Sequence, residues 1–318
     1  MLRNYRSLLI VTLMALLVSP VAMAEDRIAL TMNLQPGDSH TMVLDIDQTI
    51  NQSLMGQQMT MDQLIGMTMT YTGLDRPSDN GGVWIEVTYD RVRFKMGGPM
   101  PVDYDSKDGS ANNNPMAQGF DALVGQKLRM EFLPNGDVPN IEGVAELQQK
   151  MIDGMNLPEG PQRAAAEEAL KLQFNEDMIK QMVAAMGGMY PDQPVGVGDQ
   201  WEDKLEVGGM APMSVTSTYT LTEFDDATAT LAITGDIGPN PNAGPVMMSG
   251  MEMDAEFTGD QTGKVVMDRE TGWVVSSEIE QNMSGGMTMN LPDGQSMELD
   301  MEIKGRYTMK PAESSSSE

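Results

Sequence analysis

Methionine recurs at every second position in several runs of this chain, and this alternation constrains the fold more than any other feature. Met59-Thr-Met61 and Met67-Thr-Met69-Thr-Tyr71 are two such runs, and the chain holds 33 methionines in all. Side chains of an extended strand point alternately to its two faces, so the thioethers share one face and Thr, Asp and Gln share the other. The pattern predicts an antiparallel β protein whose core is filled by flexible, polarizable side chains.

Residues 1–24 are typical of a cleaved export signal. Arg3 and Arg6 form a basic start, an apolar run follows, and Ala22-Met23-Ala24 supplies the small residues of a cleavage site. The apolar run is too short for a comfortable membrane span. Residue 25 is Glu and the chain has no Cys. We therefore expect a soluble periplasmic or secreted protein that begins near Glu25 and is not a lipoprotein.

The chain is strongly acidic, with a formal net charge of −27 from 47 acidic and 20 basic residues. A field of that sign repels nucleic acid and anionic lipid surfaces, so we expect neither as a partner. Beyond the leader, no apolar run reaches the roughly 18 residues that a membrane helix needs. The remaining chain is long enough to bury a sizeable core, which no disulfide supports because cysteine is absent.

Alternation of apolar and polar residues predicts the strands of the first half, residues 25–140. We expect strands in these places: Arg27–Leu34, a long hairpin that turns at Gly56, Val83–Met96 and Lys127–Leu133. The apolar phase shifts near Tyr89-Asp90, which predicts a β-bulge. Residues 97–119 are rich in Gly, Pro, Asp and Asn, and predict a long surface loop.

Helical periodicity replaces the alternation in residues 141–190. Apolar residues recur at helical spacing from Val144 to Met155, Pro161 opens a stretch of good helix formers, and Asn175 is placed to cap a helix that ends at Gly187-Gly188. These features predict a helical insert between two β regions.

Alternation resumes in residues 191–311, and the serine-rich tail 312–318 predicts disorder. The strands expected here are Met213–Glu223, Ala227–Gly235, Met251–Phe257, Gly263–Met267, Trp273–Met283, Met287–Leu291 and Met297–Met309. Thr70-Tyr71-Thr72 and Thr218-Tyr219-Thr220 each precede a polar turn and a return strand. A duplicated sheet accounts for this likeness, and so does convergence of hairpin composition.

The predicted fold class is mainly β (α+β), with curved antiparallel sheets that form a pseudo-duplicated half-barrel or sandwich and carry the helical insert. Strands as long as those of the first hairpin pair well only if the sheet twists and curls. We expect the two β halves to pack together as one domain.

Several short motifs of the first half are distinctive: Met55-Gly56-Gln57, Tyr71, Tyr89-Asp90-Arg91-Val92, Met96, Gly98-Pro99, Asp105-Ser106, Asn114-Pro115 and Val124-Gly125. In these motifs the chain resembles an uncharacterised family of exported bacterial proteins known only as a domain of unknown function. The resemblance implies no activity and no catalytic residue. More loosely, a curved antiparallel sheet with helices against its concave side is similar to the LolA and LppX periplasmic carriers of lipoproteins and lipids, an analogy of fold without a shared motif.

Catalytic motifs are few, so we expect no enzyme, with an uncharacterised hydrolase as the remotest alternative. Gly37-Asp38-Ser39 imitates the nucleophile block of GDSL esterases, but the single histidine, His40, comes next and points to the opposite face of a strand. Cysteine nucleophiles and metal sites built from Cys or several His are absent from the sequence. The segment 103–109 resembles part of a calcium loop, but Lys107 stands where an EF-hand needs an oxygen ligand, which favours an ordinary acidic loop.

Copper is the sharper alternative, because thioethers select Cu(I) and exported proteins meet copper. The cluster considered for it is Met247, Met248, Met251 and Met253. Against copper, the methionines are spread over strands and helices at positions where Leu or Val would serve as core. We otherwise expect no cofactor.

A curved sheet lined with methionine can adapt to a lipid tail or to an amphipathic partner. We therefore predict an exported, non-catalytic binding or envelope-interaction protein, whose partner is an apolar small molecule, a lipid or an envelope protein. The candidate ligand-binding residues form one inward set: Met59, Met61, Met67, Met69, Tyr71, Met297 and Met301. The competing interpretation is that the helical insert fills that face through Met178, Met182 and Met186 and leaves no cavity.

Overall fold

The computed structural model describes residues 26–54, 56–98, 101–108, 115–173, 175–208, 211–243, 246–248, 251–290 and 296–313. The predicted leader and most of the predicted tail lie outside these residues. The strands are β1 (Ser39–Leu54), β2 (Gln57–Gly73), β3 (Val83–Met96), β4 (Val102–Asp105), β5 (Lys127–Phe132), β6 (Asn140–Glu142), β7 (Gln200–Val207), β8 (Met213–Phe224), β9 (Thr228–Pro239), β10 (Val246–Met248), β11 (Met251–Asp268), β12 (Val274–Asn290) and β13 (Ser296–Pro311). The helices are α1 (Pro115–Asp121), α2 (Val144–Gly154), α3 (Pro161–Gln173) and α4 (Glu176–Gly187), and η1 (Ser106–Asp108) is a 3₁₀ turn.

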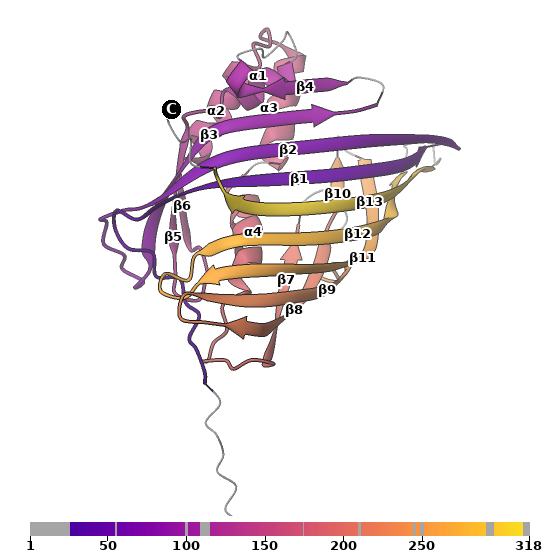
Figure 1. Ribbon diagram of the computed structural model, residues 1–318. Coiled ribbons are helices and arrows are strands. Elements are labelled where there is room, and N and C mark those ends of the chain that lie inside the picture. The colour runs from indigo at the N-terminus through magenta and orange to yellow at the C-terminus, as the bar shows by residue number, and fades with distance from the viewer. Residues whose placement is uncertain are drawn as a thin grey trace, which may run out of the picture.

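One curved antiparallel sheet dominates the molecule. Its strand order is β6-β5-β3-β2-β1-β13-β12-β11-β9-β8-β7, with β4 added to β3 and β10 added to β11. The long strands sweep across Figure 1, and α4 lies behind them, on the inside of the curve. The predicted mainly β fold, with a curved antiparallel sheet and a helical insert, is confirmed.

Two similar meanders make up most of this sheet. β1, β2, β3 and β5 lie side by side in that order, and so do β7, β8, β9 and β11, with β13 and β12 between the two groups. Tyr71 pairs with Val87 in the first meander, and Tyr219 pairs with Ile233 in the second. Each meander also has one register shift between its second and third strands. This strand-for-strand correspondence supports the predicted duplication.

The predicted bulge lies in the pairing of β2 with β3. Thr68 pairs with Arg91 and the next residue, Met69, pairs with Tyr89, so Asp90 is the extra residue. The β1–β2 hairpin also turns where predicted, at Gly56, whose φ of +81° suits glycine better than any L side chain.

Arg27–Leu34 is not a strand, contrary to the sequence prediction. The segment is extended and alternately buried, but its only bridge to another described residue is Ile28 with Val195, and Met32 donates its N–H to the carbonyl of Pro134. Leu30 and Leu34 are almost fully buried, at 1% and 0% exposed. The segment therefore crosses the core as a strap, with side-chain burial in place of a hydrogen-bonded ladder.

The long loop predicted at 97–119 is also wrong for the part of it that the structure describes, which holds β4, η1 and the start of α1. Val102 and Tyr104 of β4 pack with Phe94 and Ala117 in a small second cluster. These apolar contacts and the open edge of β3 are enough to hold a four-residue strand. Its alternating pattern is too short to be recognised in a segment rich in Gly, Pro and Asp.

β11 and β12 are each one long strand, where the sequence predicted separate pieces. Gly259 and Gly285 lie at the predicted gaps and mark close approaches instead. A Cβ atom on Gly259 would lie 2.1 Å from the carbonyl oxygen of Asn282, and one on Gly285 2.0 Å from that of Glu256. Glycine here permits strong curvature of a continuous sheet.

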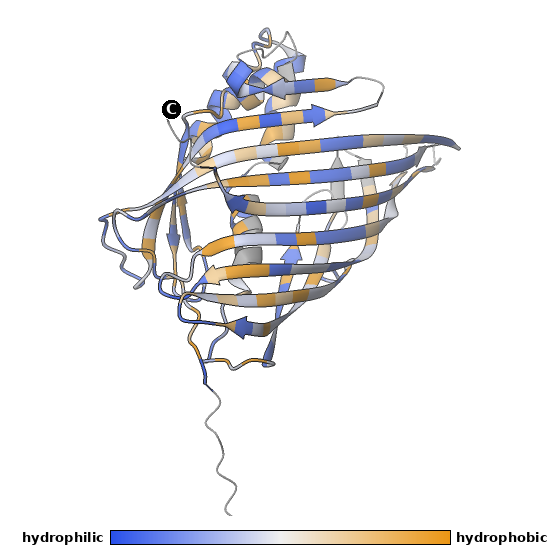
Figure 2. Ribbon diagram, in the orientation of Figure 1, coloured by the Kyte–Doolittle hydropathy of each residue, from blue (hydrophilic) through white to orange (hydrophobic). Residues whose placement is uncertain are grey.

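The main core lies between the sheet and the helices. Val144, Leu147 and Met151 of α2 and Ile179 and Val183 of α4 are buried in the same cluster as the strap and the strands. Figure 2 shows the alternation of polar and apolar residues along the strands that produces this one-sided burial. Within the described residues, no helix is both long enough and apolar enough to cross a membrane.

Candidate functional site

We call the face of the sheet that packs against α2 and α4 the inner face. Along the strands it has two parts, one packed in the core and one partly exposed. Met42 and Leu44, near the start of β1, pack in the main core. Toward the end at which β1 turns into β2, on the right of Figure 1, apolar side chains of the same face are partly exposed. Seven partly exposed methionines of β2, β12 and β13 belong to neither packed cluster, and we call them the methionine surface: Met59, Met61, Met283, Met287, Met289, Met297 and Met301.

Strand pairing makes the methionine surface continuous across β2, β1, β13 and β12. One cross-strand row consists of Met61, Ile50, Ile303 and Met283. Further along, Met297 pairs with Met289. Side chains directly opposite one another on paired strands lie about 5 Å apart at Cβ, so these side chains form an apolar surface, which Gln52 interrupts on β1 between Met59 and Met301.

A row of polar residues crosses the inner face between the packed core and the methionine surface. We call it the polar row; in register across eight strands it contains Gln63, Gln48, Gly305, Gln281, Gln261, Gly235, Ser217 and Asp203. These positions have inner parity, which means that they belong to the alternate positions whose side chains point to the inner face. Elsewhere on the same strands, most positions of inner parity carry apolar side chains. The inner face is therefore mainly apolar on both sides of this hydrogen-bonding row, with Gln52 and Gln57 as further polar positions on the side of the methionine surface.

A glycine in the polar row lets a tyrosine bridge its neighbours. A Cβ atom on Gly305 would lie 3.0 Å from the ring of Tyr307, so the ring occupies the space above that glycine. Gln48 Nε2 donates to the Tyr307 hydroxyl at 2.8 Å, and this hydroxyl donates to Gln281 Oε1 at 3.0 Å. The bridge orders the amides of two strands that are not paired directly with each other.

The far end of the polar row repeats this arrangement and ends in a carboxyl group. Gln261 lies over Gly235, and its Nε2 donates to Ser217 Oγ at 2.8 Å. Asp203 is the last member, and burial, with a smaller contribution from the charge of Asp137, raises its pKa above the usual value for an aspartate. Both effects disfavour the charged form of this carboxyl group.

The charges of the described strands are segregated by face. The strand registers assign every described strand Lys and Arg to the outer face: Arg91, Arg93, Lys95, Lys127, Arg129, Lys204, Lys264, Lys304, Arg306 and Lys310. Among the acidic residues of these strands, Asp203 alone has inner parity. The inner face thus presents thioethers, aliphatic groups and amides, with no positive charge from the described strands.

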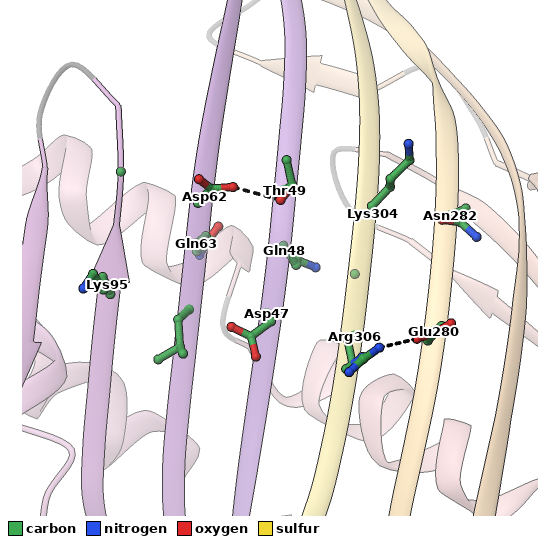
Figure 3. A pocket seen from close by; sticks show the side chains of 13 residues that line it. Asp47, Gln48, Thr49, Asp62, Gln63, Lys95, Glu280, Asn282, Lys304 and Arg306 are labelled. Atoms are coloured by element: carbon green, nitrogen blue, oxygen red, sulfur yellow. Dashed lines mark hydrogen bonds and ion pairs between the residues drawn. The ribbon is translucent and has the colours of Figure 1, made fainter.

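The outer face carries a shallow hollow of about 680 Å³ over β3, β2, β1, β13 and β12 (Figure 3). Its cations are already paired: Lys95 with Asp103 at 3.3 Å, Lys304 with Glu302 at 3.0 Å, and Arg306 with Glu280 at 2.6 Å. Leu64 is its one large apolar side chain. Such exposed pairs are screened by water and contribute little. The hollow offers one large apolar side chain and no unpaired cation, so we do not assign the site to it.

The sequence-predicted ligand residues fall into two groups. Met59, Met61, Met297 and Met301 lie in the methionine surface. Met69 and Tyr71 are buried in the main core, and Met67 packs against it. The structure brings the first four together with Met283, Met287 and Met289, which the sequence prediction did not include. The side chains of Met178, Met182 and Met186, named for the competing interpretation, lie outside the described residues.

The other candidate residues have local partners where they are described. His40 stacks on Trp273 at 5.3 Å, and Ser39 points to the other face, where its hydroxyl lies 3.2 Å from that of Thr72. Asp105 of the acidic segment is ion-paired with Arg91. Of the copper cluster, Met253 is buried, and the side chains of Met247, Met248 and Met251 lie outside the described residues.

Comparison with known proteins gives a family but no activity. A model described as a family of unknown function, DUF6263, matches residues 80–274. The chain belongs to this family. The predicted membership of a family known only as a domain of unknown function is thereby confirmed, and the looser resemblance to the LolA and LppX carriers stays a prediction. No curated protein matches the sequence.

Matches to solved structures are remote. The crystal structure of Pseudomonas aeruginosa OccK11 (OpdR) aligns at 6% identity over 88% of this chain and 98% of that chain, with a TM-score of 0.17. A structure described as "Asymmetric conductivity of engineered proteins" aligns at 8% identity over 85% of this chain and 100% of that chain, with a TM-score of 0.17. Neither likeness supports a statement about this family member.

Proposed function

We propose that this protein is an exported, non-catalytic binding protein that holds the apolar chain of one amphiphilic molecule against the methionine surface. The supporting observation is the position of seven thioethers on one face of the sheet, partly exposed and outside both packed clusters of the described residues. A contiguous apolar surface outside the core is the usual mark of an interaction site. Export rests on the leader predicted at residues 1–24.

Methionine suits an acyl chain better than branched residues do. Its side chain is unbranched, rotates about three bonds and fits irregular apolar shapes. We favour a small amphiphile over an envelope protein because the methionine surface lies on the inner side of a curved sheet. A concave apolar surface buries most of a small ligand, whereas a large partner needs open access.

Binding of an uncharged fluorescent probe with one long alkyl chain tests this proposal. Replacing Met61 and Met301 together by Gln should weaken binding about thirtyfold or more, because each thioether removed from the contact costs roughly 1–2 kcal/mol and about 1.4 kcal/mol corresponds to tenfold. The matched control replaces their outer-face neighbours, Thr60 and Glu302, by Gln, and should leave the affinity unchanged. Absence of probe binding to the wild-type protein, or equal losses in both double variants, would contradict the proposal.

Cu(I) binding is the second candidate function, and the register of three strands favours it. Met253 pairs with Met289, and Met289 pairs with Met297. Three thioethers therefore lie in one row on β11, β12 and β13, a soft ligand set of the kind that selects Cu(I). Met253 is only 2% exposed, which restricts the access of a metal to one end of this row.

A further inference from the structure

We infer that the polar row is a head-group site, and that the amphiphile held by the methionine surface has an uncharged head group that donates and accepts hydrogen bonds. Amides, hydroxyl groups and esters belong to this chemical class. The inference rests on the proposed function, since it concerns the polar end of the same ligand.

The first support is position. Three glutamines of the polar row lie two residues along their strand from a side chain at the border of the methionine surface. The pairs are Gln48 with Ile50, Gln63 with Met61, and Gln281 with Met283. From Gln281 to Met289 the strand is about 27 Å long, at roughly 3.4 Å per residue. An alkyl chain laid along β12 therefore reaches the polar row with its head while its tail stays on the methionine surface.

The second support is the set of hydrogen-bonding atoms that the row leaves available. The bridge through Tyr307 uses the Nε2 of Gln48 and the Oε1 of Gln281. Within the described residues, the Oε1 of Gln48, the Nε2 of Gln281 and the whole amide of Gln63 have no hydrogen-bond partner. A carboxamide supplies two N–H donors and a carbonyl acceptor, so the row presents both kinds of atom to a ligand.

The third support is charge. Every described strand Lys and Arg has outer parity, so the sheet itself offers an anionic head group no counter-ion on its inner face, in a chain whose net charge is −27. An unpaired charge is costly to move from water to a partly buried apolar surface. A cationic head group would find one carboxyl group, Asp203, at the end of the row furthest from Gln63. An uncharged head group meets the amides without either cost.

A series of ligands with one tail and three head groups tests the inference. Monododecanoylglycerol, dodecanoate and dodecyltrimethylammonium, each below its micelle concentration, compete with the uncharged alkyl probe for the wild-type protein. We expect the glycerol ester to bind at least tenfold more tightly than either charged ligand. In Gln281→Leu and, separately, Gln63→Leu, that preference should fall at least fivefold, while Asn282→Leu, next to Gln281 on the outer face, keeps it.

The outcomes separate the two proposals. Equal binding of all three ligands, tightest binding of a charged one, or an unchanged preference in both Gln variants overturns the head-group assignment and leaves the alkyl-binding function standing. Failure of the probe itself to bind the wild-type protein overturns both. Gln63 makes no side-chain hydrogen bond within the described residues, so its variant is expected to fold even if loss of the Tyr307 bridge affects Gln281→Leu.

Discussion

Replacing Leu34 by Ala should lower the free energy of unfolding by about 2–5 kcal/mol, the usual cost of removing a fully buried leucine side chain. Leu34 is 0% exposed and lies in the main cluster with Leu30 and Met32 of the strap. The structure gives the strap few backbone hydrogen bonds, so side-chain burial is what ties it to the core. Urea unfolding monitored by tryptophan fluorescence measures the change.

Thr31→Ala is the control for this experiment, since Thr31 lies in the same strap and its side chain is exposed. Its substitution should change the stability by no more than about 0.5 kcal/mol. The matched family segment starts at residue 80, so the comparison also tests whether residues before it belong to the same folding unit. Equal effects of the two substitutions would show that the strap is not part of the core.

Glu131→Gln should cost about 2–3 kcal/mol near neutral pH, because it disrupts a buried and fully bonded carboxylate. Glu131 is 1% exposed and accepts hydrogen bonds from Ser78, Asn80 and Asn140. A glutamine amide turns an N–H group toward these donors in place of one acceptor oxygen. The loop between β2 and β3 then loses the group that fixes it to β5.

The effect of Glu131→Gln should also depend on pH. The Ser78 hydroxyl, together with the Asn140 and Asn80 amides and against the opposing effect of burial, holds the pKa of Glu131 below its usual value. A carboxyl group whose pKa is lower in the folded state stabilises the fold above its unfolded pKa, about 4.3, and this contribution is lost as the pH falls through the folded pKa. The stability difference between wild type and variant should therefore shrink below about pH 4.3.

Exposed Glu278 supplies the control, and Glu278→Gln should change the stability by less than about 1 kcal/mol. Measuring both variants from pH 7 to pH 3 isolates the Glu131 contribution from the titration of the many other acidic residues. A Glu131→Gln difference that stays constant across this range would contradict the role given to its charge.

Alternation was enough to predict the sheet, because a period of two specifies which residues share a face. It does not specify partners, and this explains the main errors. The strap alternates between buried and exposed residues as a strand does. Its backbone hydrogen-bond partners, however, are Val195, Pro134 and Thr271, which are far away in the sequence and cannot be predicted from a local pattern. In the sequence, Gly259 and Gly285 resemble strand breaks. In the structure they lie within continuous strands, at positions where the backbone of the next strand approaches too closely for a side chain.

The candidate site was predicted in part for the same reason. Alternation alone was enough to predict that four of these methionines share the inner face: Met59, Met61, Met297 and Met301. Whether a methionine that points to this face is packed, like Met69, or partly exposed, like Met61, depends on what covers the face at that position, and alternation along one strand does not specify this. The polar row had a visible signal, since Gln48 and Gln63 interrupt the apolar parity of their strands, but only the cross-strand register aligns them into one band.

Native mass spectrometry of the protein purified from the organism that encodes it tests the central claim most directly. We predict that the protein carries one bound species with the mass of an uncharged single-chain amphiphile, and that the Met61→Gln, Met301→Gln variant loses it while the Thr60→Gln, Glu302→Gln control keeps it. A spectrum that contains only the unliganded chain, or a copper adduct without any lipid, would contradict the account.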